Sequence, residues 1–416
     1  MIYLPSTLLS KINRTNENNR TEIINLLLLV TIIVVIAFSE KRNLVIGSLG
    51  IFVFFYIFQI IKNKQVKISI YFIWMGLFIF WSLIVTLFSY DIVNSTEKTL
   101  NLILKFIFYT SLIMFFDSKE KIFLGIKALI IASLILVIRL LIVTPTELWG
   151  TERLGIAINL NSNSIGMIAS YASLSSIYLA KKFGKKYYYI FIIPFSLITL
   201  FSGSRKGFLI FAIGIILLLL FYSNNIRRFL TTALSISIFF VFIYKVVFDL
   251  PTLYNVIGKR LESFLNFIMG NTHLIDASMR TRKAMIDEAI MLIKEKPIMG
   301  YGHENFRLLS MFDTYSHNNY TEILVSTGII GLCIYYSLPM FILVLSIIKR
   351  IKLKDNEYNL IIIYLLIILI MDIGIVSYSH ILTQLLIVIS VSYYTILMKK
   401  EEKKSIINTN NVCNRV

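Results

Sequence analysis

Long blocks of apolar residues alternate with short polar segments along almost the whole chain. An α-helix needs about 20 consecutive, mostly apolar residues to cross a bilayer, and its backbone polar groups are then hydrogen-bonded within the helix itself. Candidate blocks, several of them shorter than this, lie at 23–38, 44–61, 68–88, 100–116, 122–143, 165–180, 187–201, 208–222, 229–247, 323–348, 360–378 and 381–398. The pattern therefore predicts an all-α polytopic membrane protein with about 12 transmembrane helices.

The polar segments between these blocks predict how the chain is organised. Residues 1–22 form an N-terminal arm, 23–247 contain the first nine helices, 248–319 form one large loop, 320–398 contain the last three helices, and 399–416 form a tail. The loop is the largest soluble part of the protein.

The large loop contains one helical pattern. Ile286, Ile290 and Ile293 follow one another at spacings of four and three residues, and Pro297 ends the pattern. Such spacing places the three side chains on one face of a helix. We expect an amphipathic helix that lies on the membrane surface.

The composition agrees with a membrane protein, and the charges predict its orientation. Hydrophobic residues make up 57% of the chain and charged residues 15%, whereas soluble domains carry about 25% charged residues. If both termini are cytoplasmic, 23 Lys and Arg residues lie in cytoplasmic segments and 6 in the short loops on the other side. Positive residues in short loops mark the cytoplasmic side. The loop at 248–319 is therefore predicted to be extracytoplasmic, and the topology explains most of the formal charge of +18 without nucleic acid.

Polar side chains gather in two of the short extracytoplasmic loops. The loop at 144–164 carries Arg153 and three asparagines, at Asn159, Asn161 and Asn163. Their amides could bind sugar hydroxyls, although Asn and Ser are also common where a helix begins. The loop at 202–207 reads SGSRKG and contains two adjacent cations, Arg205 and Lys206. Cations are unusual in a short extracytoplasmic loop. These two cations are candidates for binding an anionic substrate, with lipid headgroups as the alternative ligand.

A third polar cluster lies in the second half of the large loop. Arg280, Arg282 and Lys283 fall in the first turn of the predicted amphipathic helix. The free N–H groups at a helix start, together with these cations, suit a phosphate. His317 and Asn318 stand just before the block at 323–348. A histidine can act as a base near neutral pH, although a lone histidine is more often structural.

Asp372 is a carboxylate inside the apolar block at 360–378. A charge there is costly unless it is paired or functional. The sequence leaves two alternatives open, which are an ion pair with a Lys or Arg of a neighbouring helix and a role in the functional site.

The polar residues of the large loop resemble the signature of the superfamily of O-antigen ligases and O-antigen or capsular polysaccharide polymerases. That family shows an Arg fifteen residues before the Pro of Pro-x-x-Gly-x-Gly, and His-Asn at the foot of the next membrane span. The matching residues here are Arg282, Pro297, Gly300, Gly302, His317 and Asn318. SGSRKG is similar to the family's Ser-Arg-Gly loop, which gives Arg205 the matching place. Two positions depart from the pattern: Lys206 precedes the glycine, and Ile286 stands where an aromatic residue is usual.

The resemblance implies a membrane glycosyltransferase of the GT-C type. Such an enzyme transfers a glycan from a polyprenyl-diphosphate carrier to an acceptor hydroxyl on the outer face of the bacterial cytoplasmic membrane, without a metal or cofactor. Arg205 and Arg282 would bind the diphosphate and His317 would act as the base or orient the acceptor. The predicted substrate-binding residues are Arg280, Arg153, Asn159, Asn163 and Asn318.

The acceptor decides between the activities of the superfamily. The outer loops offer many Asn side chains and few cations, which favours the sugar end of another carrier-linked repeat unit over an anionic lipid core. A polysaccharide polymerase is therefore predicted, and a ligase that attaches the glycan to a lipid core is the alternative. A lipid-linked oligosaccharide flippase is a second alternative, although transporters usually place their charges along a central cavity. Expected partners are the carrier-linked oligosaccharide, membrane lipid and a chain-length regulator, and no nucleic acid.

Overall fold

The computed structural model describes residues 21–35, 47–54, 57, 69–156, 160–223 and 225–413, and all regular elements in these ranges are helices. Helices also form at Thr21–Val35 and 47–54. The labelled helices are α3 (Ile70–Leu87), α4 (Ile92–Phe115), α5 (Lys119–Val143), α6 (Ser162–Phe183), α7 (Ile192–Phe201), α8 (Arg205–Phe221), α9 (Ile226–Asp249), α10 (Pro251–Leu253), α11 (Lys259–Ile268), α12 (Ala277–Glu295), α13 (Phe306–Leu309), α14 (Asn319–Leu353), α15 (Asn359–Met371) and α16 (Ile381–Cys413).

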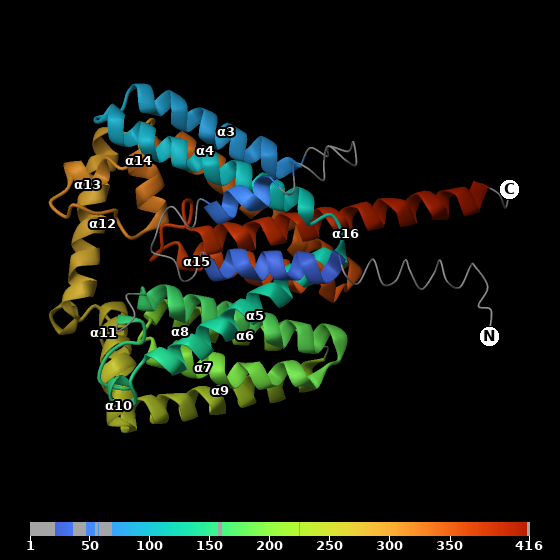
Figure 1. Ribbon diagram of the computed structural model, residues 1–416, viewed down its shortest axis with the longest axis horizontal. Coiled ribbons are helices and arrows are strands. Elements are labelled where there is room, and N and C mark those ends of the chain that lie inside the picture. Colours follow the sequence, from blue (N-terminus) through green and yellow to red (C-terminus); the bar gives the residue numbers. More distant parts are fainter. Residues whose placement is uncertain are drawn as a thin grey trace, which may run out of the picture.

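Most of the long helices form one bundle, and the large loop lies at one end of it. Helix α6 packs against α7 and α8, α3 packs against α4 and α14, and α15 packs against α16. Figure 1 shows α10 to α13 gathered at one end of the bundle, with α12 running across the direction of the long helices. The far end of α16 points away from that side. The loop predicted at 248–319 is thus a short helical layer on the bundle.

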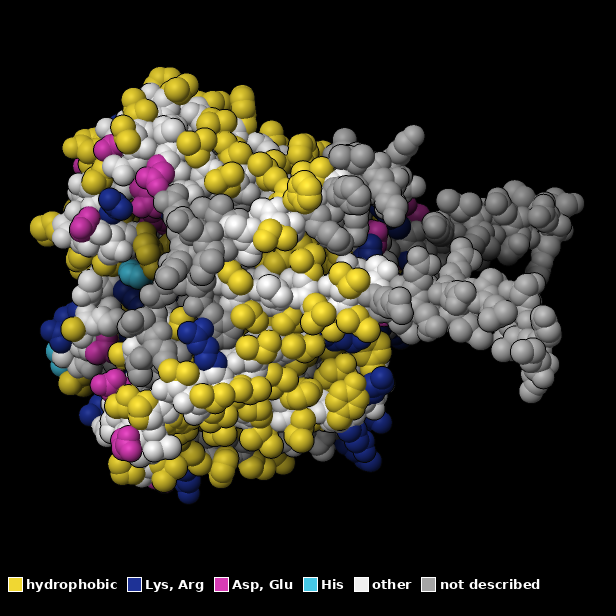
Figure 2. Space-filling model, in the orientation of Figure 1, with side chains coloured by type: hydrophobic (Ala, Val, Ile, Leu, Met, Phe, Trp, Pro, Cys, Tyr) yellow, Lys and Arg dark blue, Asp and Glu magenta, His cyan; other side chains and the backbone are white. Residues whose placement is uncertain are grey.

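Several helices are long and apolar enough to cross a membrane. The described residues contain six of them, at Ile70–Leu87, Ile92–Phe115, Lys119–Val143, Arg227–Asp249, Asn319–Leu353 and Ile381–Glu402. Three shorter apolar helices lie at Thr21–Val35, Lys186–Phe201 and Asn356–Met371. Figure 2 shows apolar side chains over the flank of the bundle, with most of the visible Lys and Arg toward its two ends. These features confirm an all-helical structure with candidate membrane spans and indicate a membrane protein, and the count of 12 spans stays a prediction.

A close contact between α6 and α8 places two polar helix starts side by side. A Cβ atom on Gly207 would lie 2.6 Å from the backbone of Gly166, so neither helix could approach so closely with a larger residue at Gly207. Ser170 Oγ lies 2.7 Å from the carbonyl oxygen of Gly207. Small residues commonly allow such close packing between membrane helices. The contact brings Asn161 and Asn163, at the start of α6, next to Arg205 and Lys206 at the start of α8.

The Pro-x-x-Gly-x-Gly segment docks onto an interruption in α14. Gly328 has φ 64° and ψ −169° inside that helix, a conformation that is essentially limited to glycine. The interruption frees backbone groups of α14, and the segment forms hydrogen bonds with them. Ile329 N–H donates to Pro297 O (2.9 Å), and Gly302 N–H donates to Ser326 O (2.9 Å). A Cβ atom on Gly300 would lie 2.5 Å from Val325 O. These glycines are therefore required by the geometry of this docking.

Helix α12 differs from the predicted amphipathic helix in two respects. Asp276 caps it by accepting a hydrogen bond from Met279 N–H (2.8 Å), so the helix starts earlier than predicted and Arg282 lies in its second turn rather than its first. Its buried residues are Met285 and Ala289, whereas Ile290 of the predicted stripe is 41% exposed.

The apolar face of α12 packs on protein. Met285 and Ala289 form a small core with Tyr301, Phe306 and Val325, which come from the docked segment, α13 and α14. The docked segment covers this face. For that reason the buried face of α12 contains Met285 and Ala289 and differs from the predicted face of Ile286, Ile290 and Ile293.

Candidate functional site

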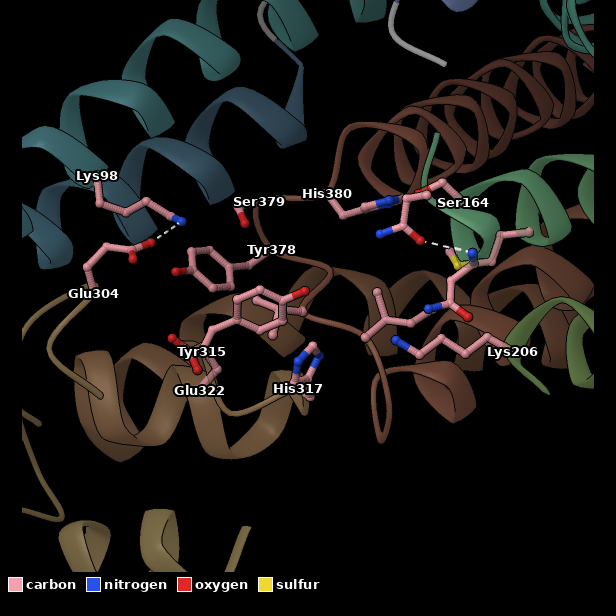
Figure 3. Close-up of a pocket in the computed structure, with 15 residues that line it drawn as sticks. Lys98, Ser164, Lys206, Glu304, Tyr315, His317, Glu322, Tyr378, Ser379 and His380 are labelled. Carbon is pink, nitrogen blue, oxygen red and sulfur yellow. Dashed lines mark hydrogen bonds and ion pairs between the residues drawn. The ribbon is translucent and has the colours of Figure 1, made fainter. Parts of the chain in front are cut away.

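A cavity of about 270 Å³ lies where the starts of α6, α8 and α14 meet the link between α15 and α16. Figure 3 shows its lining residues. They are Lys98, Asn161, Asn163, Ser164, Met167, Lys206, Glu304, Tyr315, His317, Glu322, Ile375, Val376, Tyr378, Ser379 and His380. The cavity thus brings together residues from all three polar clusters of the sequence.

Arg205 lies beside the cavity and joins α8 to α12. Its side chain is buried, and Nη1 donates to Asp276 Oδ2 at 2.8 Å. The other carboxylate oxygen of Asp276 caps α12, and the N–H of Asp276 donates to Ser263 Oγ of α11 (2.8 Å). Ser204 caps α8 by accepting from Gly207 N–H (3.0 Å). The position of Arg205 is therefore fixed by three helices at once.

Four arginines, which we call the arginine cluster, gather here: Arg153, Arg205, Arg260 and Arg282. Burial and, to a smaller extent, the charges of Arg260, Arg205 and Arg282 together lower the pKa of Arg153 to about 10. Burial and the charge of Arg205 also lower the pKa of Arg260 and of Arg282. Nearby positive charges repel one another, and a bound anion reduces this repulsion. The cluster is therefore suited to bind a multiply charged anionic group.

His317 lies on the cavity wall between the arginine cluster and the start of α14. Its backbone has φ 57°, in the left-handed region, and its ring lies 4.3 Å from that of Tyr315. Its buried Nδ1 has no hydrogen-bond partner among the described residues. Burial and, to a smaller extent, the charges of Arg282 and Lys206 together lower its pKa to about 4. The imidazole is therefore neutral at pH 7 and able to accept a proton.

The asparagines named from the sequence have different places. Asn163 lines the cavity, and its Oδ1 accepts a hydrogen bond from Arg153 Nη2 (3.0 Å). Asn161 also lines it and caps α6. Asn318 is buried, and its Oδ1 caps α14 by accepting from Tyr320 N–H (2.9 Å) and Thr321 N–H (3.2 Å). Asn159 lies outside the described residues.

Other predicted residues are held away from the cavity wall. Arg280 donates from Nη2 to Ile275 O (3.0 Å) and does not line the cavity. Arg205 and Arg282 lie behind the lining residue Lys206, whose ammonium interacts with both of their charges. Lys206, which departs from the family pattern, is thus the cation at the cavity wall next to the arginine cluster, while Lys98 lines another part of the wall.

Asp372 is bonded by neutral groups. Tyr336 Oη donates to its Oδ2 at 2.6 Å, and Asn319 Nδ2 donates to the same oxygen at 3.2 Å. The expected Lys or Arg partner is not found among the described residues. Its backbone oxygen also accepts from Asn319 N–H (2.7 Å). Asp372 therefore fixes the first turn of α14, which follows His317.

Sequence reasoning missed several residues of this region. Arg260 had a weak signal, because it lies in the amphipathic segment KRLESF of α11. Glu322 was missed because it stands just before the predicted block at 323–348, in what is the first turn of α14. Glu304, Tyr315 and His380 stand alone among residues without a motif, and only the fold brings them to one cavity.

The geometry can be compared with known protein families. Residues 190–336 match the family model described as O-antigen ligase. The matched segment runs from the turn before α7 into α14, and it includes Arg205, Arg260, Arg282 and His317. The predicted resemblance is therefore confirmed over these residues, and it supports a glycosyl-transfer enzyme of the O-antigen ligase or polymerase type. No curated protein matches the chain.

The match leaves the second alternative, a flippase, without support. The cavity also contains the polar groups that a transfer reaction needs, with a neutral histidine between cations and carboxylates. Among the described residues, no group of three or more His, Cys, Asp or Glu side chains is arranged to hold a metal ion.

Proposed function

We propose that the protein is a glycosyltransferase that moves a glycan from a polyprenyl-diphosphate carrier to a sugar hydroxyl. One observation carries the proposal: a neutral histidine with an unpartnered buried nitrogen lies on the same cavity as Lys206, next to the arginine cluster. The cations match a diphosphate, and the histidine matches a hydroxyl that must lose its proton.

The proposed reaction is a single displacement. The acceptor oxygen forms a bond to the anomeric carbon of the donor sugar, and the bond from that carbon to the diphosphate breaks. The electron pair leaves with the diphosphate, whose charge Lys206 stabilises at the cavity wall and Arg205 and Arg282 stabilise from beside it. The hydroxyl proton passes to His317. The reaction inverts the anomeric carbon, because no covalent glycosyl intermediate is formed.

The low pKa of His317 has a specific role in this reaction. In the free protein, burial and the charges of Arg282 and Lys206 keep the imidazole neutral. A bound diphosphate offsets these positive charges and raises the pKa of His317 toward its ordinary value. The histidine therefore becomes a stronger base when the donor is in place.

We further propose the membrane arrangement. The chain crosses the bacterial cytoplasmic membrane about 12 times, with both termini in the cytoplasm and residues 248–319 outside. The cavity then opens on the extracytoplasmic side, beside α11 and α12. The isoprenoid tail of the carrier lies between helices at the level of the bilayer.

The acceptor that we propose is another carrier-linked repeat unit, so that the enzyme is a polymerase and works with a chain-length regulator. Asn161, Asn163 and Ser379 on the cavity wall are neutral groups suited to sugar hydroxyls. The alternative is a ligase that uses a lipid core.

The products distinguish the two activities. Purified protein in lipid nanodiscs receives the carrier-linked repeat unit as its sole substrate. A ladder of lengthening chains is expected. Products that form only after a lipid core is added would show that the protein is a ligase.

A further inference from the structure

The cavity has two ends of different chemistry. In Figure 3, Lys206 and Ser164 lie at one end, Lys98 and Glu304 lie at the other, and His317 lies between them. The arginine cluster stands behind the first end. The second end lies away from that cluster, and the same histidine stands between it and the first end.

The second end carries carboxylates and little net positive charge. Glu304 forms an ion pair with Lys98, the lining cation of this end. Glu322 is 2% exposed, and its Oε2 accepts a hydrogen bond from Ser316 N–H (2.8 Å). Carboxylate oxygens accept hydrogen bonds from hydroxyl groups and repel other anions.

Tyrosine rings complete this end. Tyr378 lines the cavity, and its ring stacks on that of His303 with centroids 5.4 Å apart. His303 is fully buried, and its Nε2 lies 3.0 Å from Ser82 Oγ. Tyr378 is therefore held firmly from behind. A rigid aromatic wall beside a few polar groups is typical of a site for a small organic ring.

Tyr315 marks the boundary between the two ends. Burial raises its pKa, while the charge of Arg282 lowers it and that of Glu322 raises it. Tyr315 thus interacts electrostatically with Arg282 of the arginine cluster and with Glu322 of the second end, and its ring contacts that of His317. A hydroxyl held at this boundary would lie beside the histidine.

We propose that Glu304, Glu322, Tyr315 and Tyr378 form an acceptor subsite that takes a sugar ring without an anionic group. The inference rests on the proposed glycosyl transfer and adds the class of acceptor. The carboxylates accept hydrogen bonds from the hydroxyls of the acceptor ring. A uronic acid or a phosphorylated sugar is excluded, because its charge would face Glu304.

The test uses soluble acceptor analogues that lack a diphosphate. Methyl glucoside, methyl 6-amino-6-deoxyglucoside and methyl glucuronide differ only at carbon 6, which is neutral, cationic or anionic. Each compound is added as a competing acceptor to full-length protein in nanodiscs that is supplied with the carrier-linked repeat unit, and chain growth is measured. We expect the neutral and cationic compounds to inhibit at concentrations about tenfold lower than the glucuronide, since like charges in contact are strongly unfavourable.

Variants test which residue causes the preference among the three compounds. Glu304→Gln leaves Lys98 without its carboxylate, so the preference should shift toward the glucuronide by about tenfold. Asp313→Asn removes an exposed carboxylate of the same loop that does not line the cavity, and it should leave the preference unchanged. Arg282→Lys should slow chain growth without changing the order of the three inhibitors.

The outcomes separate the two proposals. Absence of any product, both from the carrier-linked repeat unit alone and after a lipid core is added, would contradict the glycosyl transfer itself. Chain growth that the three compounds inhibit equally, or that none inhibits, would overturn the acceptor subsite alone. So would a Glu304→Gln protein that discriminates as the unchanged protein does.

Discussion

At the scale of single residues, the surroundings of His317 determine its chemistry. The imidazole is buried beside Tyr315 and faces the charges of Arg282 and Lys206. Each of these influences disfavours the protonated ring. A histidine in this setting stays neutral until an anion arrives, which couples its basicity to binding of the diphosphate.

The first prediction concerns this pKa. We expect His317 to titrate near pH 4 in the free protein and at higher pH once inorganic pyrophosphate is bound. Because the folded-state pKa is lowered, the neutral ring contributes stability above about pH 6.5, and that contribution is lost as the pH falls toward 4. NMR of histidine-labelled protein measures the titration, with His317→Gln to identify the resonance. A midpoint near 6.5 without pyrophosphate would show that the site is more open than described.

The residues differ in how far the sequence could predict them. Arg205, Arg282 and His317 were found because a spacing pattern marks them. The ion pair between Arg205 and Asp276 joins residues 71 positions apart, and no local pattern predicts such a contact. The cap at Asp276 could have been recognised as an Asp before a helical segment. That cap alone moves Arg282 out of the first turn.

At the scale of elements, the interruption of α14 holds the site together. Gly328 allows the helix to change direction, and the Pro-x-x-Gly-x-Gly segment binds the backbone groups that are freed. The docked segment and α13 in turn cover α12 through Tyr301 and Phe306. Gly300 and Gly302 could be identified from the sequence only through the family resemblance, because the residues of α14 that they contact are known only from the fold.

The second prediction tests this interruption. A Cβ atom on Gly328 would lie 2.0 Å from Ile298 O, and its backbone conformation excludes other residues, so Gly328→Ala should lower the free energy of unfolding by about 3 kcal/mol or more. Gly184→Ala is the matched control, because Gly184 also has a positive φ (67°) but nothing lies within 4 Å of its Cβ position. It should cost about 1 kcal/mol. Thermal unfolding in detergent gives the comparison, and equal losses would argue against the docking role.

At the scale of the whole molecule, the apolar blocks predicted the bundle well. Most of the observed long helices coincide with a block, although α4 begins eight residues before the block at 100–116 and α16 continues past 398. These extensions are polar turns that no membrane-length criterion detects. The helical layer of α10 to α13 at one end of the bundle (Figure 1) could not be predicted, because its stability depends on contacts with α14 and α9.

The third prediction concerns topology. In a variant without Cys333 and Cys413, a cysteine placed at Lys185 should not react with a membrane-impermeant maleimide in intact cells, because the basic segment at 181–186 is expected in the cytoplasm. A cysteine at Met311, which is 90% exposed in the large loop, should react. Labelling at Lys185 but not at Met311 would reverse the orientation and place the cavity inside the cell.

The transfer rate of purified His317→Ala protein tests the central claim most directly. If His317 accepts the proton of the attacking hydroxyl, the rate from the carrier-linked repeat unit should fall by about 10² to 10⁴, while the protein remains folded and membrane-inserted. His273→Ala, at an exposed histidine of the same loop that does not line the cavity, should retain the wild-type rate. A His317→Ala protein that keeps more than about a third of the wild-type rate would contradict the account, since loss of a general base has a far larger effect.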